Sequence, residues 1–199
     1  MMNYAAAYEA ALAKFRAVSL ESMAEHSGYS LEGQCLKVDF LGQEFTVEYP
    51  TGRFDPEPSP QGELPIFAQI LVLHYLANVS EVVEEGKLIS YKELPGGGIY
   101  IQPFTNRAIN PLVKAYGENP ERLLEVALKY NGQAAKHGDV SVTLRVFPRI
   151  PVTLVLWRGD DEFPASGTIL FDASAPYLLP TEDYAVLAGF IVATMKNNR

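Results

Sequence analysis

Apolar residues recur at helical spacing near the start of the chain, which predicts an amphipathic helix over residues 4–23 that ends at Ser27-Gly28. Two short apolar runs follow at residues 35–40 and 45–49. The glycine of Leu41-Gly42-Gln43 between them is typical of a tight bend, so the pattern predicts a β-hairpin.

Residues 50–65 are rich in proline and glycine, a composition that favours an extended surface loop without ladder pairing. The helix and hairpin before this loop bury too little surface to fold alone, so we expect residues 1–199 to form a single domain. Residues 64–78 are apolar nearly all round, which predicts a buried central helix. Residues 105–116 are expected to be weakly helical despite Pro111.

Asn119-Pro120-Glu121 predicts a helix start that is capped by the asparagine side chain, with a helix continuing to Gly132. The residues expected to face inward are Leu123, Leu124, Ala127 and Leu128. This helix should cover part of a core.

Residues 140–146 alternate between apolar and polar types, as in a half-buried strand, and residues 147–151 are expected to turn the chain. Residues 152–157 and 168–171 predict two more strands in an antiparallel meander. Thr181 is expected to cap a last helix that runs to about Met195. The whole pattern predicts an α+β fold: an antiparallel sheet, made of the N-terminal hairpin plus the C-terminal meander, packed with about five helices.

The chain has a formal charge of -8 and a pI of about 4.9, which disfavours nucleic acid and anionic membrane surfaces as partners. Its single cysteine, Cys35, cannot form an internal disulfide or supply a cysteine cluster for iron–sulfur. No basic and apolar leader is evident, and the apolar stretches 64–79 and 184–195 are shorter than a bilayer span. We therefore expect a cytoplasmic protein.

Polar residues gather in the stretch Trp157-Arg158-Gly159-Asp160-Asp161-Glu162-Phe163-Pro164, at the end of one predicted strand. Together with Asp172, the acids Asp160 and Glu162 could hold a hard cation or transfer a proton. The stretch lacks the calcium-loop pattern, and no histidine pair has zinc spacing. The simpler interpretation is a turn with solvated acids and with Trp157 at the edge of the core.

Two further stretches could contact a ligand. Gly96-Gly97-Gly98 could let the backbone approach a small molecule, with Arg107 nearby to take an anion, although a flexible turn is the simpler interpretation of the glycines. Arg149 lies between Pro148 and Pro151 and could point into a cleft, or the prolines could merely shape a strand connection.

Several motifs resemble a bacterial and archaeal family, domain of unknown function number 3786. They are Phe147-Pro148-Arg149-Ile150-Pro151, Gly159-Asp160, Glu162-Phe163-Pro164, Leu179-Pro180-Thr181-Glu182-Asp183 and Ile89-Ser90-Tyr91-Lys92-Glu93-Leu94-Pro95-Gly96-Gly97. The resemblance implies a role in anaerobic metabolism. Some relatives carry a cysteine-rich segment described as an iron–sulfur or zinc-binding domain, which this chain lacks.

The sequence leaves three functional hypotheses. The first is a small-molecule-binding or accessory protein whose pocket is built from residues 157–163. Arg149 and the turn at Gly96-Gly97-Gly98, called the glycine turn below, would lie close to this pocket. The second is a metal-assisted hydrolase that uses Asp160, Glu162 and Asp172. The third is a homo-oligomeric interaction protein anchored by Trp157. The sequence identifies neither the substrate nor a cofactor.

Overall fold

The computed structural model describes residues 4–56 and 64–197, which form two compact units. The first unit extends to Val83 and includes residues 147–149 and 177–179; the second comprises the remaining residues.

Two helices open the first unit, where a single helix is expected. Helix α1 (Tyr4–Arg16) ends early, and α2 (Leu20–Ser27) begins after Ser19, whose hydroxyl accepts a hydrogen bond from the Ser22 N–H at 3.2 Å. Ser19 has extended backbone angles, and this side-chain cap favours a new helix start over continuation. The prediction of one helix over residues 4–23 was therefore wrong.

A four-stranded antiparallel sheet follows in the order β1-β2-β3-β4. Its strands are β1 (Ser30–Glu32), β2 (Cys35–Phe40), β3 (Gln43–Glu48) and β4 (Phe54–Asp55). The predicted hairpin is β2 and β3. Strand β4 lies in the stretch expected to be a loop, because Phe54 is buried and pairs with Val47; Pro58 and Pro60 of that stretch lie outside the described residues.

The core of the first unit is built around α3 (Ile66–Asn78). The ring of Tyr75 stacks on Phe147, with ring centroids 4.4 Å apart. Its hydroxyl donates to the Ser27 carbonyl at 2.6 Å and accepts from the Arg149 N–H at 3.3 Å. The predicted central helix is confirmed.

The second unit contains a five-stranded sheet in the order β5-β9-β8-β7-β6. Its strands are β5 (Leu88–Ser90), β6 (Gln133–Ala134), β7 (Val140–Phe147), β8 (Ile150–Trp157) and β9 (Ser166–Asp172). The predicted meander is β7, β8 and β9. The hairpin and the meander thus belong to two separate sheets, and the α+β class is confirmed.

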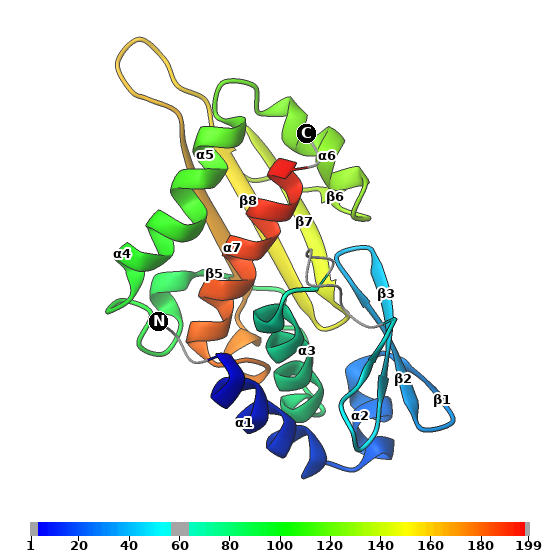
Figure 1. The fold of residues 1–199 in the computed structure, drawn as a ribbon. Helices are drawn as coiled ribbons and strands as arrows, with labels where there is room; N and C mark the ends of the chain where they lie inside the picture. The colour runs from blue at the N-terminus through cyan, green and yellow to red at the C-terminus, as the bar shows by residue number, and fades with distance from the viewer. Residues whose placement is uncertain (1–3, 57–63, 198–199) are drawn as a thin grey trace. The chain divides into compact units, whose positions relative to one another are not determined.

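Helices flank this sheet (Figure 1). Figure 1 shows α4 (Ile101–Phe104) and α5 (Asn110–Tyr116) following one another, joined by the π-helical segment η2 (Thr105–Ile109). Pro111 stands in the first turn of α5, where its missing N–H costs little. Helix α7 (Thr181–Asn197) packs on β9 through Tyr184 and Phe171, whose ring centroids are 4.9 Å apart.

Two helix ends differ from expectation. Helix α6 (Glu121–Leu128) begins after Pro120 without a side-chain cap from Asn119, and Leu128 is 72% exposed rather than inward-facing. The Thr181 hydroxyl donates to the Pro95 carbonyl at 2.7 Å, a bond to another segment rather than to its own helix. Among the described residues, no helix is long and apolar enough to cross a bilayer.

Candidate functional site

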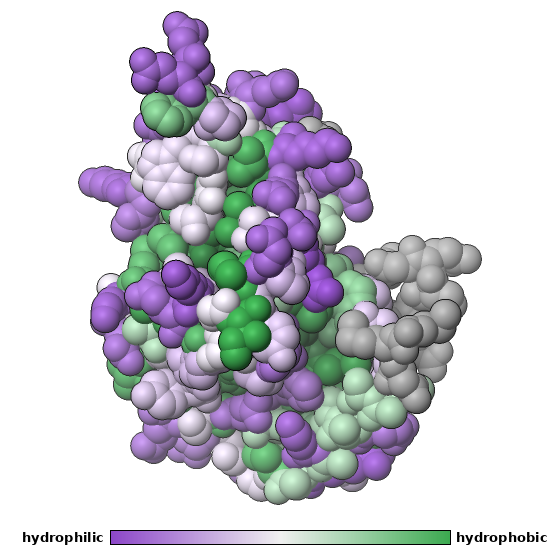
Figure 2. Space-filling model, turned by 90° about the vertical axis from the view of Figure 1, so that its left-hand side faces the viewer, coloured by the Kyte–Doolittle hydropathy of each residue, from purple (hydrophilic) through white to green (hydrophobic). Residues whose placement is uncertain are grey.

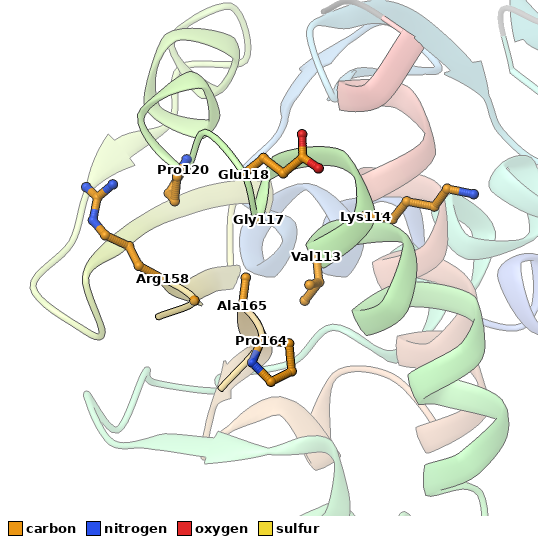
Figure 3. A pocket seen from close by; sticks show the side chains of 9 residues that line it. Val113, Lys114, Gly117, Glu118, Pro120, Arg158, Pro164 and Ala165 are labelled. Carbon is orange, nitrogen blue, oxygen red and sulfur yellow. The ribbon is translucent and has the colours of Figure 1, made fainter. Parts of the chain in front are cut away.

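The second unit has a hollow of about 580 Å³ between the end of α5 and the loop that joins β8 to β9. From α5 and the turn after it come Val113, Lys114, Gly117, Glu118 and Pro120; from the β8–β9 loop come Arg158, Gly159, Pro164 and Ala165. Figure 3 shows Val113, Pro164 and Ala165 around the hollow, while the charged side chains extend at its rim. The hollow is therefore lined by both apolar and polar atoms, with the charged side chains of Lys114, Glu118 and Arg158 toward its edges.

Small residues let the end of α5 pack closely against residues 165–167 beside this hollow. A β-carbon on Gly117 would lie 3.0 Å from Cβ of Ala165, and one on Gly167 would lie 3.1 Å from Cγ2 of Val113. Such distances are tighter than ordinary contacts, so the helix end approaches the strand because these positions lack side chains. Figure 2 shows hydrophobic surface among hydrophilic side chains on this side of the molecule.

The charged side chains at the rim differ in whether they form ion pairs. Arg158 forms an ion pair with Glu121, with a second hydrogen bond at 3.3 Å, and its N–H donates to the Asp139 carboxylate at 2.7 Å. The hydrogen bond from Arg158 lowers the pKa of Glu121. Within residues 4–56 and 64–197, Lys114 and Glu118 have no ion-pair partner. Lys114 is therefore the cation available to a ligand.

Asp160 stabilises the conformation of the β8–β9 loop through hydrogen bonds to the backbone. Its carboxylate accepts hydrogen bonds from the N–H groups of Phe163 at 2.7 Å and Glu162 at 2.9 Å, and these bonds lower its pKa. The Asp160 N–H in turn donates to the Phe163 carbonyl at 2.8 Å. Asp160 thus closes a tight turn, and Glu162 is exposed beside it.

Asp172 lies at the far end of β9 from this loop. Strand β9 pairs with β8 from Ser166 opposite Trp157 to Phe171 opposite Val152, so six residues of extended chain, about 20 Å, separate Asp172 from the loop. No group of three metal-binding side chains forms among the described residues. The structure therefore does not bring Asp160, Glu162 and Asp172 together.

The Asp172 carboxylate instead ties two segments of the second unit together. It is buried and accepts hydrogen bonds from the N–H groups of Glu85 at 2.9 Å, Gly86 at 2.8 Å and Ser174 at 2.9 Å. Burial alone would raise its pKa, but these hydrogen bonds outweigh burial and the pKa is lowered. This role explains a buried charge without any ligand.

The remaining predicted residues are not among those that line the hollow. Trp157 is the last residue of β8 and is 40% exposed. Arg149 belongs to the first unit, where its backbone N–H donates to Tyr75. Arg107 is exposed on η2.

The glycine turn has a steric explanation. Gly96 has a positive φ of 72°. A β-carbon on Gly97 would lie 1.9 Å from the Tyr91 carbonyl oxygen. These two glycines are required by the turn itself, as the simpler interpretation held.

Sequence reasoning found only one side of the hollow. The polar loop drew attention to residues 157–163, but Val113, Lys114 and Gly117 carry no motif and precede the loop by some forty residues in the chain. The one available signal was the small residue Gly117 at the end of a helix, which is also an ordinary helix stop.

Comparisons with known proteins give a family and nothing more specific. A family model described as "Domain of unknown function (DUF3786)" matches residues 19–194. No curated protein and no solved structure matches the chain.

Proposed function

The chain belongs to the DUF3786 family, whose description assigns no activity, and we propose from its geometry that it is a small-molecule-binding protein. The ligand would occupy the hollow between α5 and the β8–β9 loop. The observation that carries this proposal is the hollow itself: its volume of about 580 Å³ falls within the range of about 300–1,000 Å³ usual for ligand pockets.

The lining favours a ligand with a compact apolar body and an anionic group. Val113, Pro164 and Ala165 offer apolar contacts inside. Lys114 supplies a cation at the rim, and its flexible side chain can turn toward a bound anion. Arg158 is already paired with Glu121, so its contribution is mainly to shape the rim.

We propose binding rather than catalysis because of the residue types present. The described residues that line the hollow include no serine, cysteine, histidine or aspartate. Lys114 and Glu118 do line it, but within the described residues neither has a hydrogen-bond partner of the kind that activates a nucleophile in covalent catalysis. The separation of Asp172 from the loop gives no support to the hydrolase. We also propose a cytoplasmic location, because a single cysteine suits a reducing compartment.

Native mass spectrometry of protein purified from its own host tests the proposal. We expect a retained small mass that disappears on denaturation. Pro164→Trp should fill the hollow and abolish the retained mass, because residue 164 is exposed and a larger side chain there leaves the core intact. Lys114→Glu should reduce it by charge repulsion.

The matched control is Lys136→Glu, which makes the same charge change at an exposed residue outside the hollow. It should retain the mass as the wild type does. A retained mass that is equal in all three variants would place the ligand elsewhere and overturn the assignment of this hollow.

A further inference from the structure

Arg158 lines the hollow and is held by contacts at both of its ends. Its backbone N–H donates to the Asp139 carboxylate at 2.7 Å, and the Asp139 N–H donates to the Leu156 carbonyl at 2.9 Å. Its guanidinium donates one hydrogen bond to each carboxylate oxygen of Glu121, and one of these bonds is 3.3 Å long. Because a two-bond contact of this kind fixes the direction of an arginine, the position of the cation depends on Glu121.

Glu121 is well placed to hold this cation. It stands in the first turn of α6, directly after Pro120, which also lines the hollow. The start of a helix carries a partial positive charge that favours a carboxylate. The hydrogen bond from Arg158, followed by one from its own backbone, lowers the pKa of Glu121. Glu121 is therefore ionised at neutral pH and is a constant counter-charge beside the hollow.

Figure 3 shows the direction in which this cation points. The Arg158 side chain extends away from Val113 and Ala165, the apolar part of the lining, on the side of Pro120. The side chain is 50% exposed, so packing alone does not hold it in this direction. The contact with Glu121 is thus what keeps the Arg158 cation turned outward.

The other charged residues of the lining leave one cation free. In the part of the chain that the structure describes, Lys114 and Glu118 form no ion pair. Figure 3 shows their side chains extending in different directions. One negative charge on a ligand therefore has Lys114 as its partner. A second negative charge would find Arg158 already paired and would be repelled by Glu118.

We propose that Glu121, by holding Arg158 outward, makes the hollow selective for a monoanion over a dianion that has the same body. This inference rests on the proposed function and names the ligand class of the same hollow. Glu121 is a positioning residue, because it acts on the ligand only through Arg158. A monocarboxylate carries one negative charge at neutral pH and a dicarboxylate carries two, so the favoured ligand is a small monocarboxylic acid.

Titration of the full chain with benzoate and with isophthalate tests the inference. The two probes share one ring and carry one and two carboxylates. Binding is followed by NMR shifts of the backbone amides of residues 113–118. In the wild type, benzoate should give a saturable shift and bind more tightly than isophthalate. Pro164→Trp fills the hollow and should abolish the response to benzoate.

Glu121→Gln removes the counter-charge and releases Arg158. The affinity for isophthalate should rise about two- to fivefold, the range expected for one exposed ion pair, and the affinity for benzoate should change less. The preference for benzoate should therefore narrow or reverse. A double variant, Glu121→Gln with Arg158→Gln, should lose this gain because no cation is released. A merely structural role of Glu121 would not change the ratio of the two affinities.

Glu125→Gln is the matched control, because it makes the same charge change at an exposed residue of α6 that does not line the hollow. It should keep the wild-type preference. An unchanged preference in Glu121→Gln, or an equal change in Glu125→Gln, would overturn the inference. So would a wild-type response that saturates with neither probe, or benzoate binding that persists in Pro164→Trp. The proposed function is decided separately, by the retained mass in native mass spectrometry.

Discussion

Gly97 lies directly against the carbonyl oxygen of Tyr91: a β-carbon on residue 97 would stand 1.9 Å from that oxygen. No real contact is so short, so any side chain at this position must push the backbone apart. The ring of the same tyrosine stacks on Phe104, with centroids 4.0 Å apart. The turn and the tyrosine are therefore a single packed feature.

Gly97→Ala should lower the free energy of unfolding by about 1–3 kcal/mol, the usual cost of overpacking. Urea unfolding measures this change. Gly98→Ala is the matched control, because its nearest neighbour would be Cγ of Lys92 at 3.9 Å, an ordinary contact. Equal losses in the two variants would contradict the steric explanation.

Asp172→Asn should destabilise the protein by about 1–3 kcal/mol at neutral pH, because three N–H donors, of which that of Ser174 is buried, would lose the charged oxygens that accept their bonds. The control Asp161→Asn changes an exposed acid and should have little effect. Urea unfolding of both variants provides the measurement.

The stabilisation by Asp172 should also depend on pH. The folded protein lowers the pKa of Asp172 below the value of about 3.9 expected for an unfolded chain. Its contribution is therefore complete above the unfolded pKa and is lost as the pH falls through the lower, folded pKa. The difference between wild type and Asp172→Asn should shrink below about pH 4; a difference that grows there would contradict this assignment.

Tyr75→Phe should lower the free energy of unfolding by about 1–3 kcal/mol, because the Ser27 carbonyl and the Arg149 N–H would lose their buried partner. The stacked ring is retained, so the loss reports the hydroxyl. Tyr177→Phe, at a residue 67% exposed, should be neutral. Thermal and urea unfolding compare the two.

Asp160→Ala should loosen the β8–β9 loop without unfolding the sheet. The N–H groups of Glu162 and Phe163 would lose the carboxylate that they bond. Hydrogen exchange at these two amides should accelerate, while the amides of β8 exchange as before. Asp161→Ala is the control; protection that persists in Asp160→Ala would show that the loop is held by other contacts.

Local patterning predicted the elements whose burial is regular. The alternation over residues 140–146 reports one face of β7, because inward residues repeat every second position in a strand. Prediction from local patterning failed where a single tertiary or capping contact outweighs the pattern. Ser19 interrupts an apolar periodicity by capping α2, and Phe54 pairs within a proline-rich stretch because its ring is buried.

The candidate site was predictable only in part, for a related reason. Polar residues after a strand mark a loop, and the loop does line a hollow. Which helix faces that loop depends on the approach of Gly117 to Ala165, and this approach leaves no local periodicity in the sequence. Likewise, the presence of Asp160, Glu162 and Asp172 within 13 residues of sequence does not reveal where each carboxylate lies. In the structure, Asp172 accepts hydrogen bonds from the backbone N–H groups of Glu85 and Gly86.

The sequence by itself determined the α+β class, the acidic charge and most of the helices and strands, because these follow from composition and from short-range spacing. Only the tertiary structure decided that the hairpin and the meander belong to separate sheets, and that the Arg107 side chain lies against Gly189. Such pairings join residues far apart in the chain, and their free energy depends on shape and burial in three dimensions rather than on any local pattern.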